Sequence, residues 1–290
     1  MLRTPPPPIA VGIVFCAVLV AAGVPLRAQE APGRWPARII DVHEHSAFDP
    51  AASDAAISNT REGLLAAWGD AGIVGAVVHL PQGSVDPPDL PGPVRFCAGV
   101  GAEPDTIALG RALADQRVQC VKIYLGYVPR WASDPVYEPV YRLAARHRVP
   151  VVFHTGDTES ARAKLKYADP LTVDEVAVDH PDVTFVIAHC GNPWLQSAAE
   201  VAYKNPNVYL ECSALMTGDM DGVPAAARER YVVDAIRWVL GYVEDPTKLM
   251  FGSDWPLVDV AAYVRAYMEA VPAEQWGAVF HDNAARVFGF

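Results

Sequence analysis

The chain has 290 residues, of which 51% are hydrophobic and 20% charged, and its formal net charge is −11. This length and apolar content favour one large α/β domain over two small ones. The sequence has no Lys/Arg stripe and no basic tail, which argues against nucleic-acid binding. We therefore expect no nucleic-acid partner and leave a homo-oligomer open.

The first 28 residues have the pattern of a signal peptide. Arg3 precedes a run of prolines and an apolar segment from Ile9 to Val24, and Leu26-Arg27-Ala28 resembles a cleavage site. The apolar segment is too short for a comfortable membrane span, although an uncleaved anchor is the alternative. We predict a signal peptide over 1–28, a single domain over 29–290, export to a bacterial periplasm, and no membrane association after cleavage.

Four cysteines follow the signal segment, and each lies in or beside an apolar, strand-like run. They are Cys97, Cys120, Cys190 and Cys212. Their spacing is neither that of a disulfide scaffold nor that of a zinc knuckle. Export would permit disulfides, but we expect buried single thiols.

The rest of the chain alternates between strand-like and helical patterns. The predicted strands are Ile39–His43, Ile73–Leu80, Val94–Val100, Val118–Leu125, Val149–His154, Val183–His189, Val208–Cys212 and Leu249–Gly252. The predicted helices are Thr60–Gly69, Asp105–Gln116, Val136–Arg146, Val173–Asp179, Leu195–Tyr203, Ala225–Leu240 and Ala261–Ala270, with a closing segment Ala273–Phe290. Eight such repeats predict an α/β protein with a closed (β/α)8 TIM barrel.

Long connections follow several of the predicted strands, whereas the connections that precede strands are short. The long ones include Pro81–Pro93, Gly126–Pro135, Thr155–Leu171 and Ser213–Pro224. In a (β/α)8 barrel these loops meet at the C-terminal face, where active sites lie. We therefore expect the functional site at that face.

Side chains that commonly bind metals stand where several predicted strands end. They are His43 and His45 on the first strand, His154 on the fifth, His189 on the sixth and Asp254 after the eighth. Alternation along a strand places His43 and His45 on one face. Any one of the four histidines could be an ordinary buried residue, but that reading does not explain four histidines and an aspartate at the same level of one barrel.

These motifs identify the chain as similar to the amidohydrolase superfamily. It resembles the amidohydrolase-related group that includes aminocarboxymuconate-semialdehyde decarboxylase. The resemblance rests on Asp41–His45, Lys122-Ile123-Tyr124, His154-Thr155-Gly156, Ala188–Asn192 and Gly252-Ser253-Asp254, and on the closing Asp282–Gly289 segment. It runs from about Ile39 to the end of the chain and implies a metal-dependent enzyme without specifying its substrate.

The resemblance implies that His43, His45, His154 and Asp254 bind a divalent metal ion. Zinc is expected, and manganese is the alternative. The metal would activate a water molecule and polarise a carbonyl group. Asp254 would take the proton from that water and pass it to the leaving group, while His189 would polarise the substrate carbonyl.

Lys122 alternates with the aliphatic residues of its strand, so it is expected to point into the barrel, where a buried lysine needs a partner. In some superfamily members a lysine at this place is carbamylated and bridges two metals. Lys122 and His189 could therefore serve a second metal or the substrate, although we favour one metal. Tyr124 and His79 are weaker candidates for substrate binding, because both end strands at the expected mouth.

The sequence thus favours a metal-dependent hydrolase that acts on the amide, lactone or ester carbon of a small carbonyl compound. A nonoxidative decarboxylase is the first alternative, because one metal site can serve both reactions. A non-catalytic exported binding protein is the second alternative. It would be expected to lack one or more ligands, and this sequence retains all of them.

Overall fold

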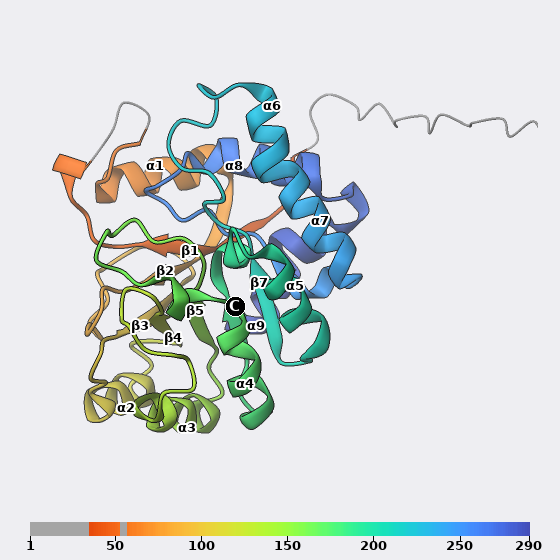
Figure 1. The fold of residues 1–290 in the computed structure, drawn as a ribbon. Helices are drawn as coiled ribbons and strands as arrows, with labels where there is room; N and C mark the ends of the chain where they lie inside the picture. Colours follow the sequence, from red (N-terminus) through yellow and green to blue (C-terminus); the bar gives the residue numbers. More distant parts are fainter. Residues whose placement is uncertain (1–34, 53–56) are drawn as a thin grey trace, which may run out of the picture. The chain divides into compact units, whose positions relative to one another are not determined.

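A computed structural model describes residues 35–52 and 57–290, and residues Pro36–Phe290 form one compact unit. Within the described residues eight parallel strands follow one another around a nearly closed barrel in chain order (Figure 1). The strands are β1 (Ile39–His45), β2 (Ile73–His79), β3 (Val94–Val100), β4 (Cys120–Tyr124), β5 (Val151–His154), β6 (Phe185–Ile187), β7 (Val208–Glu211) and β8 (Leu249–Met250). The predicted (β/α)8 TIM barrel is confirmed.

The barrel closes between its last and first strands through backbone hydrogen bonds beyond the end of β8. Val42 N donates to Phe251 O at 3.0 Å, and Asp254 N donates to His43 O at 2.7 Å. The segment that carries Asp254 is therefore attached directly to the strand that carries His43. This closure brings together two motifs that are about two hundred residues apart in the sequence.

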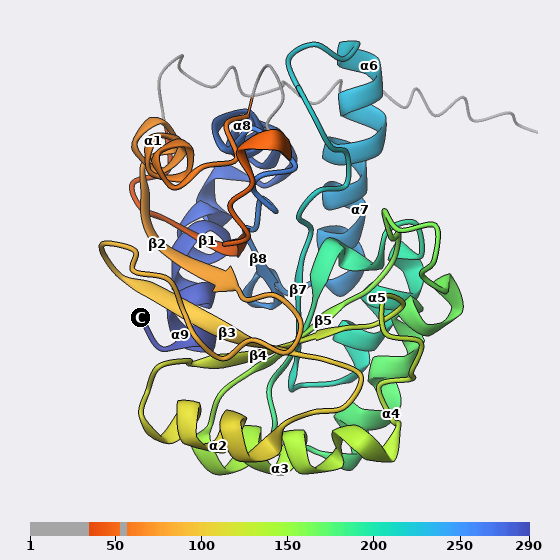
Figure 2. The same cartoon turned by 90° about the vertical axis from the view of Figure 1, so that its left-hand side faces the viewer.

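Helices cover the outside of the barrel, and their first turns show why they begin where they do. They are α1 (Arg61–Ala71), α2 (Thr106–Ala114), α3 (Glu138–His147), α4 (Leu171–Asp179), α5 (Leu195–Lys204), α6 (Ala225–Arg228), α7 (Asp234–Val243), α8 (Val260–Ala270) and α9 (Asn283–Phe288). Thr60, Asp105 and Asp259 each accept a hydrogen bond from a first-turn N–H, which satisfies a backbone donor that has no partner within the helix. Figures 1 and 2 show α2 and α3 side by side outside the strands.

The strands have apolar faces on both sides, as expected for a sheet enclosed by helices. Val121, Ile123 and Phe153 belong to the outer core. A second, smaller cluster inside the barrel includes Val42, Val77, Val152 and Met250. This inner cluster fills the barrel below the level of the candidate site and leaves the C-terminal mouth for polar side chains.

Several strands are shorter than predicted, and two of these differences matter for candidate site residues. β6 ends at Ile187 rather than at His189, and β8 ends at Met250 rather than at Gly252. His189 has φ 59° and Asp254 has φ 73°, which are left-handed conformations that do not occur within a strand. Both side chains therefore come from turns that follow strands.

The expectation of four buried single thiols is wrong, because the cysteines form two disulfides. Cys97 pairs with Cys120, and Cys190 pairs with Cys212. Cys97 and Cys120 are register partners on β3 and β4, with Cα atoms 4.2 Å apart. The sequence separations are 23 and 22 residues, one βα repeat each, so each pair occupies equivalent places in neighbouring βα repeats. The sequence argument looked for a disulfide-scaffold spacing and not for this repeat length.

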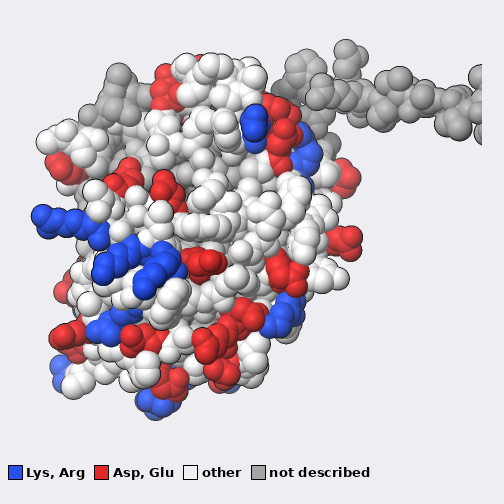
Figure 3. Space-filling model, in the orientation of Figure 1, with Lys and Arg blue, Asp and Glu red and all other residues white. Residues whose placement is uncertain are grey.

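The predicted signal peptide, 1–28, lies outside the described residues. In the described ranges, no helix has the length and apolar character needed to cross a membrane. On the face drawn in Figure 3, Lys and Arg side chains are interspersed with Asp and Glu.

Candidate active site

A cavity of about 370 Å³ opens among the loops that follow the strands. Volumes of this order are typical of sites for small ligands. Its lining contains all eight candidate site residues of the sequence analysis and adds residues of the long loops. The lining residues are His43, His45, Ala47, His79, Pro81, Gln82, Lys122, Tyr124, Tyr127, His154, Glu159, His189, Asp254, Pro256 and Leu257.

Buried carboxylates orient His43. Its Nδ1 lies 2.6 Å from Oε1 of Glu211, at the end of β7, so Nδ1–H donates to the carboxylate. The lone pair of Nε2 then faces the cavity, as in the carboxylate–histidine pairs of metal sites. The backbone N–H groups of His43 and Ser253 both donate to Asp41 Oδ1, at 3.0 and 2.9 Å. Asp41 therefore links the two segments that carry the site.

Asp254 is almost completely buried and faces the two histidines of β1. Its Oδ1 lies 3.0 Å from His45 Nε2 and 3.5 Å from His43 Nε2, yet in the described chain this oxygen accepts no hydrogen bond. Gly252 makes the close packing possible, because a Cβ there would lie 2.8 Å from Glu211 Oε2. An unsatisfied carboxylate oxygen this close to imidazole nitrogens is costly unless another group binds it.

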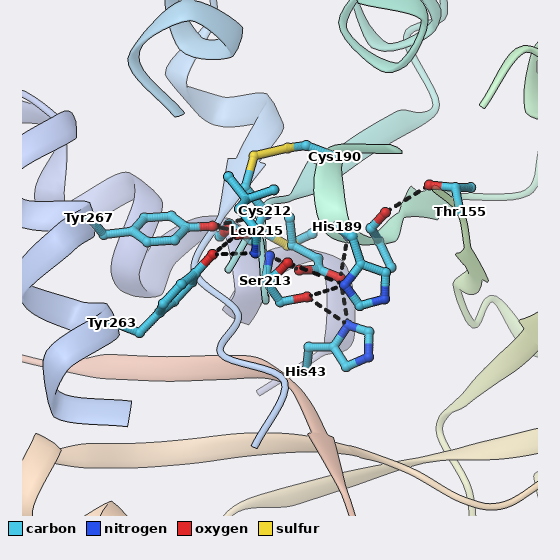
Figure 4. The surroundings of a disulfide bond; sticks show 12 residues. His43, Thr155, His189, Cys190, Cys212, Ser213, Leu215, Tyr263 and Tyr267 are labelled. Atoms are coloured by element: carbon cyan, nitrogen blue, oxygen red, sulfur yellow. Dashed lines mark hydrogen bonds and ion pairs between the residues drawn. A yellow bond between two sulfur atoms is a disulfide. The ribbon is translucent and has the colours of Figure 1, made fainter. Parts of the chain in front are cut away.

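A chain of hydrogen bonds connects Ser213, His189 and His154. Ser213 Oγ lies 2.9 Å from His189 Nδ1, His189 Nε2 lies 3.1 Å from His154 Nδ1, and His154 Nε2 lies 2.9 Å from the Asp157 carbonyl oxygen. Neutral rings satisfy all three contacts if the Ser213 hydroxyl donates to His189 and each ring donates from Nε2. Figure 4 shows the Ser213 end of this chain beside the Cys190–Cys212 disulfide.

Lys122 and Tyr124 lie on β4, and His79 is the last residue of β2. Lys122 is 1% exposed, and its Nζ lies 3.4 Å from His43 Nε2. The Tyr124 hydroxyl donates to the Leu80 carbonyl at 2.6 Å. The His79 ring lies edge-on against His43, with centroids 4.4 Å apart. The sequence prediction that Lys122 points into the barrel is confirmed.

Burial determines the protonation of these groups. It lowers the pKa of His43, His79 and His154 well below the usual range and that of His189 to about 4, with the nearby Lys122 adding to the effect. Burial also lowers the pKa of Lys122 to about 8. It opposes ionisation of Asp254, but the adjacent His45, His189 and Lys122 outweigh it and hold the pKa of Asp254 at about 2. His43, His79, His154 and His189 are therefore neutral, and Asp254 is ionised.

These residues fit a divalent metal ion. His43, His189 and Asp254 each offer a ligand atom, and the three atoms lie within 4.8 Å of one another. His45 approaches the same carboxylate oxygen of Asp254. Neutral imidazoles and a carboxylate oxygen that lacks a hydrogen bond are the donors that such an ion takes.

The structure brings His43, His45, His189 and Asp254 together as the sequence predicts, but it places His154 differently. Both nitrogens of His154 already have partners, His189 and the Asp157 carbonyl. His154 lines the cavity, and its role as a metal ligand stays a prediction.

Sequence reasoning missed Glu211 and Ser213. Glu211 Oε2 accepts a hydrogen bond from Ser213 N at 2.7 Å, and Oε1 binds His43. A signal was present, since Tyr209-Leu210-Glu211 places a carboxylate at the end of an apolar strand, as in the other strand-end candidates. The predicted strand extended one residue further, to Cys212, so Glu211 was not recognised as a strand-end residue.

The model of one protein family matches residues 87–290, more than half of the chain, and the family is described as Amidohydrolase. The chain belongs to the amidohydrolase family. This confirms the resemblance found in the sequence and makes the protein a member of an enzyme family. No sequence among the curated proteins matches this amidohydrolase.

Several solved structures share the fold of this amidohydrolase at low sequence identity. A putative 2-pyrone-4,6-dicarboxylic acid hydrolase from Pseudomonas putida has a TM-score of 0.63 and 19% identity, covering 87% of this chain and 97% of its own. A second structure is 5-carboxyvanillate decarboxylase from Novosphingobium aromaticivorans, complexed with manganese and 4-hydroxy-3-methoxy-5-nitrobenzoic acid. It has a TM-score of 0.62 and 14% identity, covering 87% of this chain and 96% of its own. An uncharacterized TIM-barrel protein from Bordetella bronchiseptica has a TM-score of 0.62 and 19% identity, covering 87% of this chain and 98% of its own.

Proposed function

We propose that this amidohydrolase is a metal-dependent hydrolase of a small carbonyl compound, acting on a lactone, ester or amide. The observation that carries the proposal is the buried Oδ1 of Asp254, which accepts no hydrogen bond among the described residues and lies 3.0 and 3.5 Å from the Nε2 atoms of His45 and His43. We assign His43, His45 and Asp254 as ligands of one divalent ion, zinc or manganese, with His154 or His189 as a further ligand. When bound, such an ion supplies an activated water and polarises the substrate carbonyl.

Asp254, His189 and Glu211 have separate roles in the proposed reaction. Asp254 is ionised at neutral pH, so its carboxylate accepts the proton of the attacking water and returns it to the leaving group. His189 Nε2 lies 3.1 Å from His154 Nδ1, and an Nε2–H of His189 turned to the substrate oxygen would stabilise the charge that develops there. Glu211 holds the Nε2 of His43 toward the cavity through the bond to Nδ1.

Decarboxylation is the second candidate, and a specific observation favours it. Among the structures that share this fold, 5-carboxyvanillate decarboxylase was solved with manganese and an aromatic acid. The same buried imidazoles and carboxylate would serve a substrate that loses carbon dioxide. The two reactions differ in product, so one screen separates them.

The experiment starts with the metal content of the purified protein. Hydrolysis of lactones, esters and amides and carbon dioxide release from ring carboxylic acids are then measured in parallel, with and without added zinc or manganese. Asp254→Asn and His43→Ala should abolish turnover in a protein that keeps its circular dichroism spectrum. Glu44→Gln is the matched control, because Glu44 is buried on the same strand but bonds Trp68. Undiminished activity of Asp254→Asn would overturn the assignment.

We also propose that the protein is exported, with cleavage after Ala28. The two disulfides support this proposal, since such bonds persist in oxidising compartments and are rare in the cytosol. N-terminal sequencing of the protein recovered from a periplasmic fraction would test it, and an intact N-terminus in the cytosolic fraction would contradict it.

A further inference from the structure

A second, smaller cavity lies beside the main one. This side cavity measures about 70 Å³ and shares part of its wall with the main cavity of about 370 Å³. The residues that line both are Tyr127, His154, Glu159, His189, Asp254 and Leu257. Asp254 and His189 are the two residues that the proposed function places at the reacting carbonyl. A substrate whose scissile bond lies beside them therefore has one half in each cavity.

The side cavity extends toward the loops that follow β5, β6 and β7. The residues that line it but not the main cavity are Asp157, Asn192, Ala214 and Thr217. Asp157 N donates to Asn192 O at 2.8 Å, and Asn192 N donates to His189 O at 2.9 Å. Gly156 is required here, since a Cβ would lie 2.2 Å from Asn192 O. Backbone hydrogen bonds thus hold this wall against the turn that carries His189.

The polar groups of the side cavity are available to a ligand. Asp157 and Glu159 are exposed, and their carboxylates make no ion pair or hydrogen bond within residues 35–52 and 57–290. The side chains of Asn192 and Thr217 also make no hydrogen bond in this part of the chain. In the shared wall Asp254 is 4% exposed, and its Oδ1 accepts no hydrogen bond from the described residues. No Lys or Arg is among the described residues that line the side cavity.

This negative charge determines which half of a substrate the side cavity takes. Hydrolysis converts the acyl half into a carboxylate, which Asp157 and Glu159 repel. The other half of an amide leaves as an amine, which is protonated at neutral pH and attracted by the same carboxylates. An alcohol released from an ester gains no charge, and a lactone releases no separate group. The side cavity has room for about three or four non-hydrogen atoms, so the amine is small.

We propose that the side cavity is a leaving-group subsite for a small amine, and that the substrate is an amide of such an amine. This proposal rests on the proposed function, which places the scissile carbonyl carbon beside Asp254. The oxygen of water forms a bond to that carbon, the C–N bond breaks, and Asp254 returns the proton of the water to the departing nitrogen. Proton transfer between the carboxylic acid and the amine then gives a carboxylate and an ammonium ion, and the exposed rim of the side cavity lets the ammonium ion leave to water.

The test compares three benzoyl amides whose amine halves are positive, neutral and negative: N-(2-aminoethyl)benzamide, N-(2-hydroxyethyl)benzamide and N-benzoylglycine. With the zinc-loaded full-length protein, kcat/KM should be about fivefold higher for the positive amide than for the neutral one, the scale of two solvent-exposed charge pairs. The negative amide should be the slowest. High salt should reduce these differences, because it screens exposed charges. N-cyclohexylbenzamide, whose amine half exceeds the side cavity, should be slower than the neutral amide.

Variants assign the preference to the side cavity. Asp157→Asn and Glu159→Gln should each reduce the preference for the positive amide, and the double variant should remove it. The backbone contacts of Asp157 to His154 and Asn192 do not involve the substituted carboxylate. Glu175→Gln is the matched control, because Glu175 is an exposed carboxylate on α4 outside both cavities.

Binding of the same three amides to the chelated protein, measured by calorimetry, separates the subsite from the proposed function, because it needs no turnover. A preference for the positive amide that persists in Glu175→Gln and disappears in the double variant supports the proposal. Equal binding of the three amides, binding of none of them, or a preference that the double variant retains overturns it. If the double variant does not fold, the two single variants decide. Absence of any hydrolysis with zinc or manganese would contradict the proposed function without removing a binding preference.

Discussion

Individual side chains at the site are controlled by buried neighbours that do not themselves face the cavity. Glu211 directs His43, Ser213 connects to His189, and Asp41 joins β1 to the segment that follows β8. Each of these contacts is buried away from water, where hydrogen bonds to charged groups are strong and their loss is costly. Changes at these positions should therefore alter the site without removing any residue that contacts the substrate.

Glu211→Gln should weaken zinc binding by about ten- to a hundredfold, because a neutral amide orients His43 and raises its basicity less than a carboxylate does. The measurement is competition with a chromogenic chelator. Glu44→Gln, which changes a buried carboxylate bonded to Trp68, should leave the zinc affinity unchanged. Equal affinities in the wild type and Glu211→Gln would show that Glu211 does not position the ligand.

His79→Asn should change how stability depends on pH in the chelated protein. In the folded state the pKa of His79 lies well below 6.5, so below about pH 6.5 the unfolded chain binds a proton that the folded chain does not. Wild-type stability therefore loses about 1 kcal/mol per pH unit from this group as the pH falls from 6.5 toward 5. The variant lacks that loss. Urea unfolding of both proteins at pH 7.5 and 5.5 tests this, and a constant difference between them would contradict it.

At the scale of elements, the turns after the strands carry the reactive groups, and a disulfide fixes one of these turns. His189, Cys190 and Gly191 all have left-handed backbone conformations, with φ of 59°, 45° and 65°. Gly191 is required there, since a Cβ would lie 2.2 Å from the Pro170 ring. Left-handed conformations at the other two residues are unfavourable unless the surroundings hold them. The Cys190–Cys212 bond joins this turn to the end of β7, between Glu211 and Ser213.

The two disulfides offer a matched pair of variants. The Cys190→Ala/Cys212→Ala and Cys97→Ala/Cys120→Ala variants each open a loop of similar length, 22 and 23 residues, so each should lose about 3 kcal/mol of stability. Only the first pair adjoins His189. We expect kcat to fall at least tenfold more in the first variant than in the second, measured below both melting temperatures. Equal kcat values would mean that the disulfide does not position His189.

At the scale of the whole molecule, the site lies where the first and last strands of the barrel meet. His43 and His45 lie on the first strand and Asp254 after the last, and the backbone bonds of Asp254 and Phe251 to β1 close the ring. A metal ion bound by these residues would connect the first strand to the segment that follows the last strand. Its binding free energy would be added to the stability of the folded state.

Removal of the metal should therefore lower the melting temperature. With free zinc at 100 times its dissociation constant, the stabilisation is about 2.7 kcal/mol, and a domain of this size shifts by about 2–4 °C per kcal/mol. Calorimetry with zinc and with chelator should thus differ by several degrees for the wild type and by little for Asp254→Asn. A wild-type melting temperature that chelation does not change would contradict a site at the closure.

Much of the fold followed from the sequence because the repeat is local. Apolar strands, capped helices and short return turns recur along the chain, and Val94–Val100 is predicted residue for residue. The ends of β6 and β8 were misplaced because their apolar runs continue into turns whose left-handed residues carry no glycine signal at His189 or Asp254. The disulfides were missed because the spacing of one βα repeat, 22 and 23 residues, was not considered. Glu211 was missed because the predicted strand was extended to Cys212, and its partner His43 is 168 residues away.

The sequence by itself determined the barrel, the family and the presence of His43, His45, His189 and Asp254 at one mouth, since strand order and alternation place strand ends together. Only the tertiary structure decided which nitrogen of each ring is already bonded, that Asp254 keeps an oxygen without a hydrogen bond, and that a second, smaller cavity lies beside Asp254. These facts depend on distances of a few ångströms between strands far apart in the chain. Local patterns do not contain such distances, because packing in all three dimensions sets them.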